Sequence, residues 1–139
     1  MTVQFACRAA GVPGPARIRR WVRAARPRAA DITVRVVGAR EGRSLNRAFL
    51  GKDYATNVLA FPYGSRGGAL QGDVVLCAPV IAREARAQGR ELSAHYAHLT
   101  VHAVLHLRGY LHNAAGEAAR MERAERGILR RLGYSDPYR

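Results

Sequence analysis

Three histidines near the C-terminus have the type and the spacing of metal ligands. His102, His106 and His112 lie in the stretch HAVLHLRGYLH. Residues four apart lie on one face of a helix, so the imidazoles of His102 and His106 can reach the same ion. Gly109 breaks the helix after His106, and the turn that it permits can bring His112 round as a third ligand. The spacing therefore predicts a metal site with three histidine ligands.

Three histidine ligands leave a coordination position open for water, which is typical of catalytic zinc sites. The spacing H-x-x-x-H-x-x-G-x-x-H is also that of metzincin proteases, but the glutamate that activates water in those enzymes is replaced here by Ala103. Met121 is predicted to lie inside a helix, so it does not supply their methionine turn. A peptidase is therefore disfavoured. One Zn²⁺ ion is the expected cofactor, although imidazole also suits nickel, iron and copper. His95 and His98 share the same helix face and are expected to pack behind the ligands.

The charge of the chain points to a polyanionic partner. Its 139 residues include 23 Lys and Arg against 10 Asp and Glu, which gives a net charge of +13. Nearly all of this charge is arginine, whose planar fork suits phosphate. We therefore expect nucleic acid as the partner, with an anionic membrane surface as the second possibility. No apolar run approaches the ~20 residues of a membrane span, and the two cysteines lack CxxC spacing. We expect a cytoplasmic protein that does not insert into a membrane.

The elements that must position these residues follow from the hydrophobic periodicity. Ile18, Trp21, Val22 and Ala25 fall at the i, i+3, i+4, i+7 spacing of an amphipathic helix. Strands are predicted at 2–6, 32–38, 56–63 and 72–79, a turn at 64–68, and helices within 11–28 and at 44–50, 80–89, 92–109 and 113–133. Ser44 and Ser93 are the expected helix N-caps. The helix 92–109 is apolar nearly all round, so it should run through the centre of one α+β domain spanning residues 1–139.

Four stretches resemble the bacterial YbeY family. They are GKDYATNVLAFPY (51–63), GDVVLCAPVIAREA (72–85), HLTVHAVLHLRGYLH (98–112) and LGYSDPY (132–138), in the order that the family has them. The resemblance implies a metal-dependent, single-strand-specific endoribonuclease of rRNA processing, acting in late small-subunit rRNA maturation and ribosome quality control. It also implies a small mixed sheet with a central helix, and Zn²⁺ held by His102, His106 and His112. The implied partners are the small ribosomal subunit and the GTPases that mature it.

Two positions depart from the pattern of that family. The arginine that usually precedes Gly-Lys-Asp is Leu50, and the aspartate that usually precedes the last ligand is Leu111. In the family that arginine is thought to assist catalysis. Arg47, one helical turn earlier, and Lys52 are the candidates to supply the catalytic charge. Lys52 and Arg108 are the candidates for binding the phosphates of RNA.

Further residues have two possible roles. Asp53 and Asp73 are candidate general bases, with capping and turn roles as the alternative. Tyr54, Phe61 and Tyr63 are candidates for stacking on bases, although Phe61 also suits the core. The missing family arginine leaves a second function open, that of a non-catalytic ribosome- or RNA-binding factor with a structural metal site.

Overall fold

Four strands form a mixed sheet in the computed structural model, which describes residues 1–110 and 115–138. In spatial order the strands are β1 (Thr2–Phe5), β2 (Ala30–Val37), β4 (Ala69–Cys77) and β3 (Val58–Arg66). β2 pairs in parallel with both β1 and β4, whereas β3 and β4 form an antiparallel hairpin. The small mixed sheet that the family resemblance implied is therefore confirmed.

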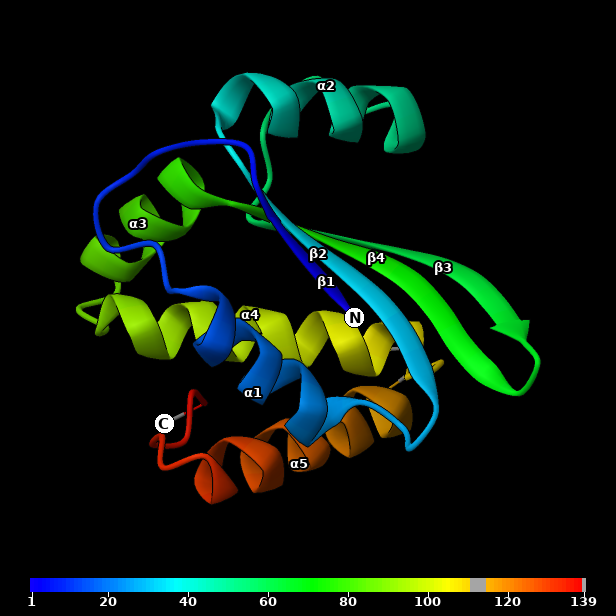
Figure 1. Ribbon diagram of the computed structural model, residues 1–139. Coiled ribbons are helices and arrows are strands. Elements are labelled where there is room, and N and C mark those ends of the chain that lie inside the picture. The colour runs from blue at the N-terminus through cyan, green and yellow to red at the C-terminus, as the bar shows by residue number, and fades with distance from the viewer. Residues whose placement is uncertain (111–114, 139) are drawn as a thin grey trace.

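Helices flank the sheet on both of its faces. They are α1 (Pro15–Ala25), α2 (Ala39–Leu50), α3 (Ala78–Ala87), α4 (Leu92–Leu107) and α5 (Ala115–Arg131). α2 covers one face, α1 and α4 pack against the other, and α5 lies beyond α4 (Figure 1). This arrangement confirms the α+β class and the central place of the histidine-bearing helix. Among the described residues, no helix combines the length and the apolarity that a membrane span requires.

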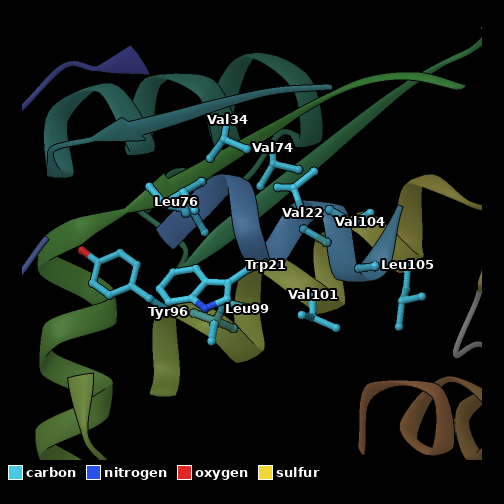
Figure 2. Close-up of a cluster of buried hydrophobic side chains, with 14 of the residues drawn as sticks. Trp21, Val22, Val34, Val74, Leu76, Tyr96, Leu99, Val101, Val104 and Leu105 are labelled. Carbon is cyan, nitrogen blue, oxygen red and sulfur yellow. The ribbon is translucent and has the colours of Figure 1, made fainter. Parts of the chain in front are cut away.

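The main core lies between the sheet and helices α1 and α4 (Figure 2). The buried residues of α1 are the four whose spacing predicted the helix: Ile18, Trp21, Val22 and Ala25. Val34 of β2 and Val74 of β4 meet them from the sheet, since branched side chains pack well on a pleated surface. α4 is buried on most sides because α1 and the sheet lie on one side of it and α5 on another.

The C-terminal end of α4 sits close against the sheet at Gly72 of β4. A Cβ atom added to Gly72 would lie 2.7 Å from Cδ2 of Leu107 and 3.1 Å from the carbonyl oxygen of Phe61. Only a residue without a side chain leaves room for this approach. Leu107 directly follows His106 in α4, so Gly72 helps to determine where the second predicted metal ligand lies.

Both predicted serine N-caps are wrong. α2 begins at Ala39, with Gly38 as its N-cap, so Ser44 lies inside the helix rather than at its start. The earlier turn of α2 contains Gly42, which packs against Cys77; a Cβ there would lie 3.0 Å from the sulfur. Close tertiary packing thus favours a glycine at this position inside the helix. In α4 the N-cap is Glu91, and Ser93 lies in the first turn.

The β3–β4 hairpin is longer than its sequence pattern predicted. β3 continues past Pro62 to Arg66 through an irregularity between Pro62 and Gly64, where Gly64 has a φ of 80°. Proline is tolerated here because β3 is an edge strand. The predicted turn at 64–68 therefore shortens to Gly67 and Gly68. At the other end of β4, residues 78 and 79 begin α3 instead of ending the strand.

Candidate metal centre

The structure places two of the three predicted metal ligands on one face of α4. His102 and His106 are one helical turn apart, and both side chains are half-buried. α4 ends at Leu107, and Gly109 has a φ of 94°, so the chain turns where the sequence predicted. His112 and Leu111 lie outside the described residues. Within residues 1–110 and 115–138 no three potential ligand side chains converge, so the third ligand stays a prediction.

A buried carboxylate on α5, that of Glu125, is hydrogen-bonded to His102. Oε1 of Glu125 is hydrogen-bonded to Nδ1 of His102. Oε2 of the same carboxylate accepts hydrogen bonds from Nε2 of His98, at 3.2 Å, and from the hydroxyl of Tyr138. The Glu125 side chain is fully buried, and a cavity of about 400 Å³ bounded by His102, Glu125 and Tyr138 opens beside it.

These contacts determine the charge of Glu125 and the proton position on His102. Burial raises the pKa of Glu125, but the hydrogen bonds from His102, His98 and Tyr138 outweigh it and lower the pKa to about 2. The carboxylate is therefore ionised at neutral pH and can only accept hydrogen bonds. Nδ1 of His102 is consequently the donor in this contact, which leaves Nε2 as the nitrogen that would bind a metal ion.

The hydrogen bonds continue from Glu125 along α4 toward its N-terminus. Nη1 of Arg90 donates to Nδ1 of His98 at 3.3 Å and to Nδ1 of His95 at 2.9 Å. Nε2 of His95 then donates to Glu84 of α3 at 2.9 Å. Burial, with a smaller contribution from the Arg90 charge, holds the pKa of His95 below its usual value, so this imidazole is neutral. His95 and His98 thus lie behind the predicted ligands, as the sequence suggested.

The chain of contacts ends in the loop between α2 and β3. Nδ2 of Asn57 donates to Oε1 of Glu84 at 3.0 Å. The same loop is tied to α2 by Asn46, whose Nδ2 donates to the carbonyl oxygen of Tyr54 at 2.8 Å. A polar connection therefore runs from the loop that carries Lys52 to His102.

Arg47, one of the two predicted sources of catalytic charge, lies on a different face of the sheet from His102 (Figure 1). Arg47 lies on α2 and borders a cavity of about 450 Å³ together with Arg40 and Arg43. α2 and α4 cover opposite faces of the sheet (Figure 1), so the sheet separates Arg47 from the two histidines. Lys52 is exposed in the loop after α2. Arg108, at the end of α4, donates to the carbonyl oxygen of Ala25 at 2.8 Å and thereby ties α4 to α1.

The two candidate general bases both have partners within the protein. Asp53 makes a bidentate ion pair with Arg43, at 2.8 and 3.0 Å, and the hydrogen bond from Arg43 lowers the pKa of its carboxyl. Asp73 accepts a hydrogen bond from the hydroxyl of Tyr63 at 2.9 Å. Because its pKa is lowered, the Asp53 carboxylate is a weaker base. These contacts favour the structural roles that the sequence also allowed.

The aromatic candidates divide between the core and the surface. Phe61 is partly buried and packs on Phe49, with ring centroids 5.1 Å apart. Tyr54 and Tyr63 expose more than half of their surface, at 55% and 62%. Of the three candidates, Tyr54 and Tyr63 therefore present a ring on which a base could stack.

Glu125 is a residue in contact with a predicted ligand that the sequence analysis did not identify. It lies on the core-facing stripe of α5, whose other members include Met121, Ile128 and Leu129. A carboxylate on an otherwise apolar stripe is the signal that could have found it, since buried charges are almost always paired.

Comparison with known proteins decides which family this architecture belongs to. The family described as Endoribonuclease YbeY matches residues 17–133. The chain belongs to the YbeY family. A member from Thiobacillus denitrificans is 55% identical over 139 residues, covering 99% of this chain and 95% of the relative. A member from Nitrosomonas eutropha is 55% identical over 138 residues, covering 99% and 97%. The family resemblance seen in the sequence is therefore confirmed.

A solved structure supports the fold of this YbeY member. The solution structure of TM1509 from Thermotoga maritima aligns with a TM-score of 0.57 at 19% sequence identity, covering 100% of this chain and 99% of the other. At that identity the similarity concerns the fold alone. The function predicted from the sequence, an endoribonuclease of rRNA processing, is the one that YbeY family membership supports.

Proposed function

We propose that this protein is a zinc-dependent endoribonuclease that cleaves single-stranded RNA in late small-subunit rRNA maturation and ribosome quality control. The endoribonuclease reaction is that of its family. The observation that carries the metal dependence is the contact between His102 and Glu125. Metal-ligating histidines characteristically donate their other ring N–H to a carboxylate, which orients the ring and raises its basicity.

The donor set suits zinc. His102 and His106 supply two imidazoles one turn apart, and His112 is the proposed third ligand. When bound, such an ion polarises a phosphoryl oxygen and makes water a better nucleophile. Glu125 holds the His102 ring in one tautomer and one orientation. Ala103 is buried and apolar, so α4 offers no carboxylate at the position that metzincin proteases use.

RNA is the substrate that the charge of the protein favours. A net charge of +13 attracts a phosphate backbone, and cleavage builds negative charge that arginines can neutralise. Lys52 and Arg108 are the proposed contributors, whereas Arg47 lies on the opposite face of the sheet from the two histidines (Figure 1). Exposed tyrosine rings suit unpaired bases, which stack on aromatic faces whatever their sequence. Single-stranded rRNA in the cytoplasm is therefore the proposed target, and the small ribosomal subunit and its maturation GTPases are the proposed partners.

Replacement of a predicted ligand tests this function. His106→Ala should remove bound zinc, because two remaining imidazoles hold the ion poorly. It should also abolish cleavage of a single-stranded rRNA fragment. In the wild-type protein a chelator should stop cleavage, added Zn²⁺ should restore it, and a duplex of the same sequence should resist. Wild-type zinc content together with wild-type cleavage in the variant would refute the proposed site.

Leu50 favours one alternative function. This residue replaces the arginine that the family resemblance led us to expect, and its side chain is exposed at the end of α2. A protein without that charge could bind rRNA through its basic surface and hold zinc only for structure. Because RNA binding is expected either way, the deciding measurement is turnover by the purified protein. Tight rRNA binding without any chelator-sensitive turnover would favour this alternative.

A further inference from the structure

Glu125 is an acidic residue whose side chain the fold buries completely. All ten acidic residues of the chain are described by the structure, and Glu125 alone among them is buried. Removing a carboxylate from water is unfavourable unless hydrogen-bond donors compensate for the lost hydration. Here a cluster of donors does so, namely His102, His98 and Tyr138. The fold therefore maintains a negative charge directly behind one predicted metal ligand.

The two carboxylate oxygens have separate partners. Oε1 is bonded to Nδ1 of His102, whereas His98 and Tyr138 both donate to Oε2. We infer that Glu125 is the positioning residue of the metal centre, which turns the metal-binding nitrogen of His102 toward the ion, and that Tyr138 in turn holds Glu125. This inference rests on the metal site of the proposed function. It adds a residue that acts through His102 rather than on the substrate.

Contacts between the C-terminal tail and α5 place Tyr138 beside Glu125. Asp136 accepts hydrogen bonds from Nε of Arg126, at 3.2 Å, and from the backbone N–H of Tyr138, at 2.8 Å. The guanidinium of Arg126 lies 5.2 Å from the centre of the Tyr138 ring, and the His98 ring lies 5.5 Å from it on an edge-to-face contact. The tail therefore folds back onto α5 beside Glu125. Tyr138 thus belongs to the surroundings of the proposed metal centre.

A purely structural tie between α4 and α5 would behave differently from a positioning residue. Loss of a tie lowers the free energy of unfolding but leaves the metal affinity of the folded protein unchanged. Loss of a carboxylate behind a metal-ligating histidine typically costs 10–100-fold in metal affinity. The affinity of the folded, metal-free protein for Zn²⁺ therefore distinguishes the two roles without any measurement of activity.

The chain offers a matched pair of tyrosines for this test. Tyr138→Phe removes the hydroxyl that donates to Glu125. Tyr134→Phe removes another tail hydroxyl, which contacts Ser93 at 3.2 Å and not Glu125. Zn²⁺ affinity is measured by competition with a chromophoric chelator, and the Co²⁺ absorption spectrum reports the ligand geometry. We expect a loss of zinc affinity of about 10–100-fold in Glu125→Gln and a smaller loss in Tyr138→Phe. Tyr134→Phe should keep wild-type affinity and spectrum.

Two results would overturn the inference. One is wild-type zinc affinity in folded Glu125→Gln. The other is equal affinity in the two tyrosine variants, which tests the inference even if Glu125→Gln fails to fold. The ¹⁵N shifts of His102 in the metal-free protein give a separate check, because Glu125 should hold its proton on Nδ1. Failure of the wild-type protein to bind zinc would instead refute the metal site, and the tautomer of His102 would still report on Glu125.

Discussion

The close approach of α4 to the sheet makes Gly72→Ala an informative substitution. The added methyl would lie 2.7 and 2.9 Å from the two Cδ atoms of Leu107 and 3.1 Å from the carbonyl oxygen of Phe61. The leucine can rotate away, but the backbone oxygen cannot move without disturbing β3. The φ of Gly72 is not left-handed, so the effect reports lack of space rather than backbone strain.

The expected magnitude follows from overpacking. Inserting a methyl into a well-packed core costs about 1–3 kcal/mol. For a chain of 139 residues, the entropy of unfolding is about 0.3 kcal/mol per kelvin, so the Tm should fall by roughly 3–10 °C. Because Leu107 adjoins His106, zinc affinity should fall as well. Thermal unfolding followed by circular dichroism, and chelator competition, are the measurements.

Gly116→Ala is the control for Gly72→Ala. Gly116 lies in α5, where an added Cβ would meet nothing within 4 Å. Alanine is favoured over glycine in a helix by about 0.5–1 kcal/mol, so this variant should be as stable as the wild type or slightly more so. An unchanged Tm in Gly72→Ala, alongside an unchanged control, would refute the claim that Gly72 positions the end of α4.

Three further predictions concern other parts of the molecule. Leu50→Arg should raise the rate of single-stranded RNA cleavage about tenfold or more, since a cation stabilises the charge of the transition state; an unchanged rate would show that Leu50 does not limit the chemistry. Leu105→Ala should lower the free energy of unfolding by about 2–5 kcal/mol in urea titration, because Leu105 is fully buried; a loss below 1 kcal/mol would contradict its place in the core. His95, in contact with Arg90 and Glu84, should make stability fall as the pH drops below about 6.5, because burial lowers its folded pKa and the unfolded chain binds the proton more readily. His95→Gln should weaken this dependence of Tm on pH, and an identical pH profile would contradict the assignment.

Hydrophobic spacing and the positions of glycines predicted those elements whose formation depends on residues close together in the sequence. The amphipathic spacing of α1 identified all four of its buried residues. Gly109 is predicted to break a helix, and it has a left-handed backbone, with a φ of 94°. The errors arose where contacts between distant residues override local preference. Gly42 lies inside α2, where it packs closely against Cys77, and an added Cβ would lie 3.0 Å from the sulfur.

In the candidate site, too, local sequence features could be predicted, whereas contacts between distant residues could not. The identities and the helical spacing of His102 and His106 are properties of the sequence, and they were sufficient to predict metal binding on one face of α4. The sequence could not show that Glu125 lies behind His102, because the two are 23 residues apart and meet only when α5 packs on α4. It also could not show that the sheet separates Arg47 from the histidines.

The sequence by itself thus determined the residue types, the helix period and the net charge, because these depend on the chain alone. From them came the metal-ligand pair and the preference for RNA, and the resemblance of its motifs indicated the family. Only the tertiary structure decided which carboxylate contacts His102, which tyrosine contacts that carboxylate, and which face of the sheet carries Arg47 (Figure 1). The physical reason is that a hydrogen bond or an ion pair depends on distances of a few ångströms. For residues far apart in the chain, those distances are set by the packing of the helices on the sheet.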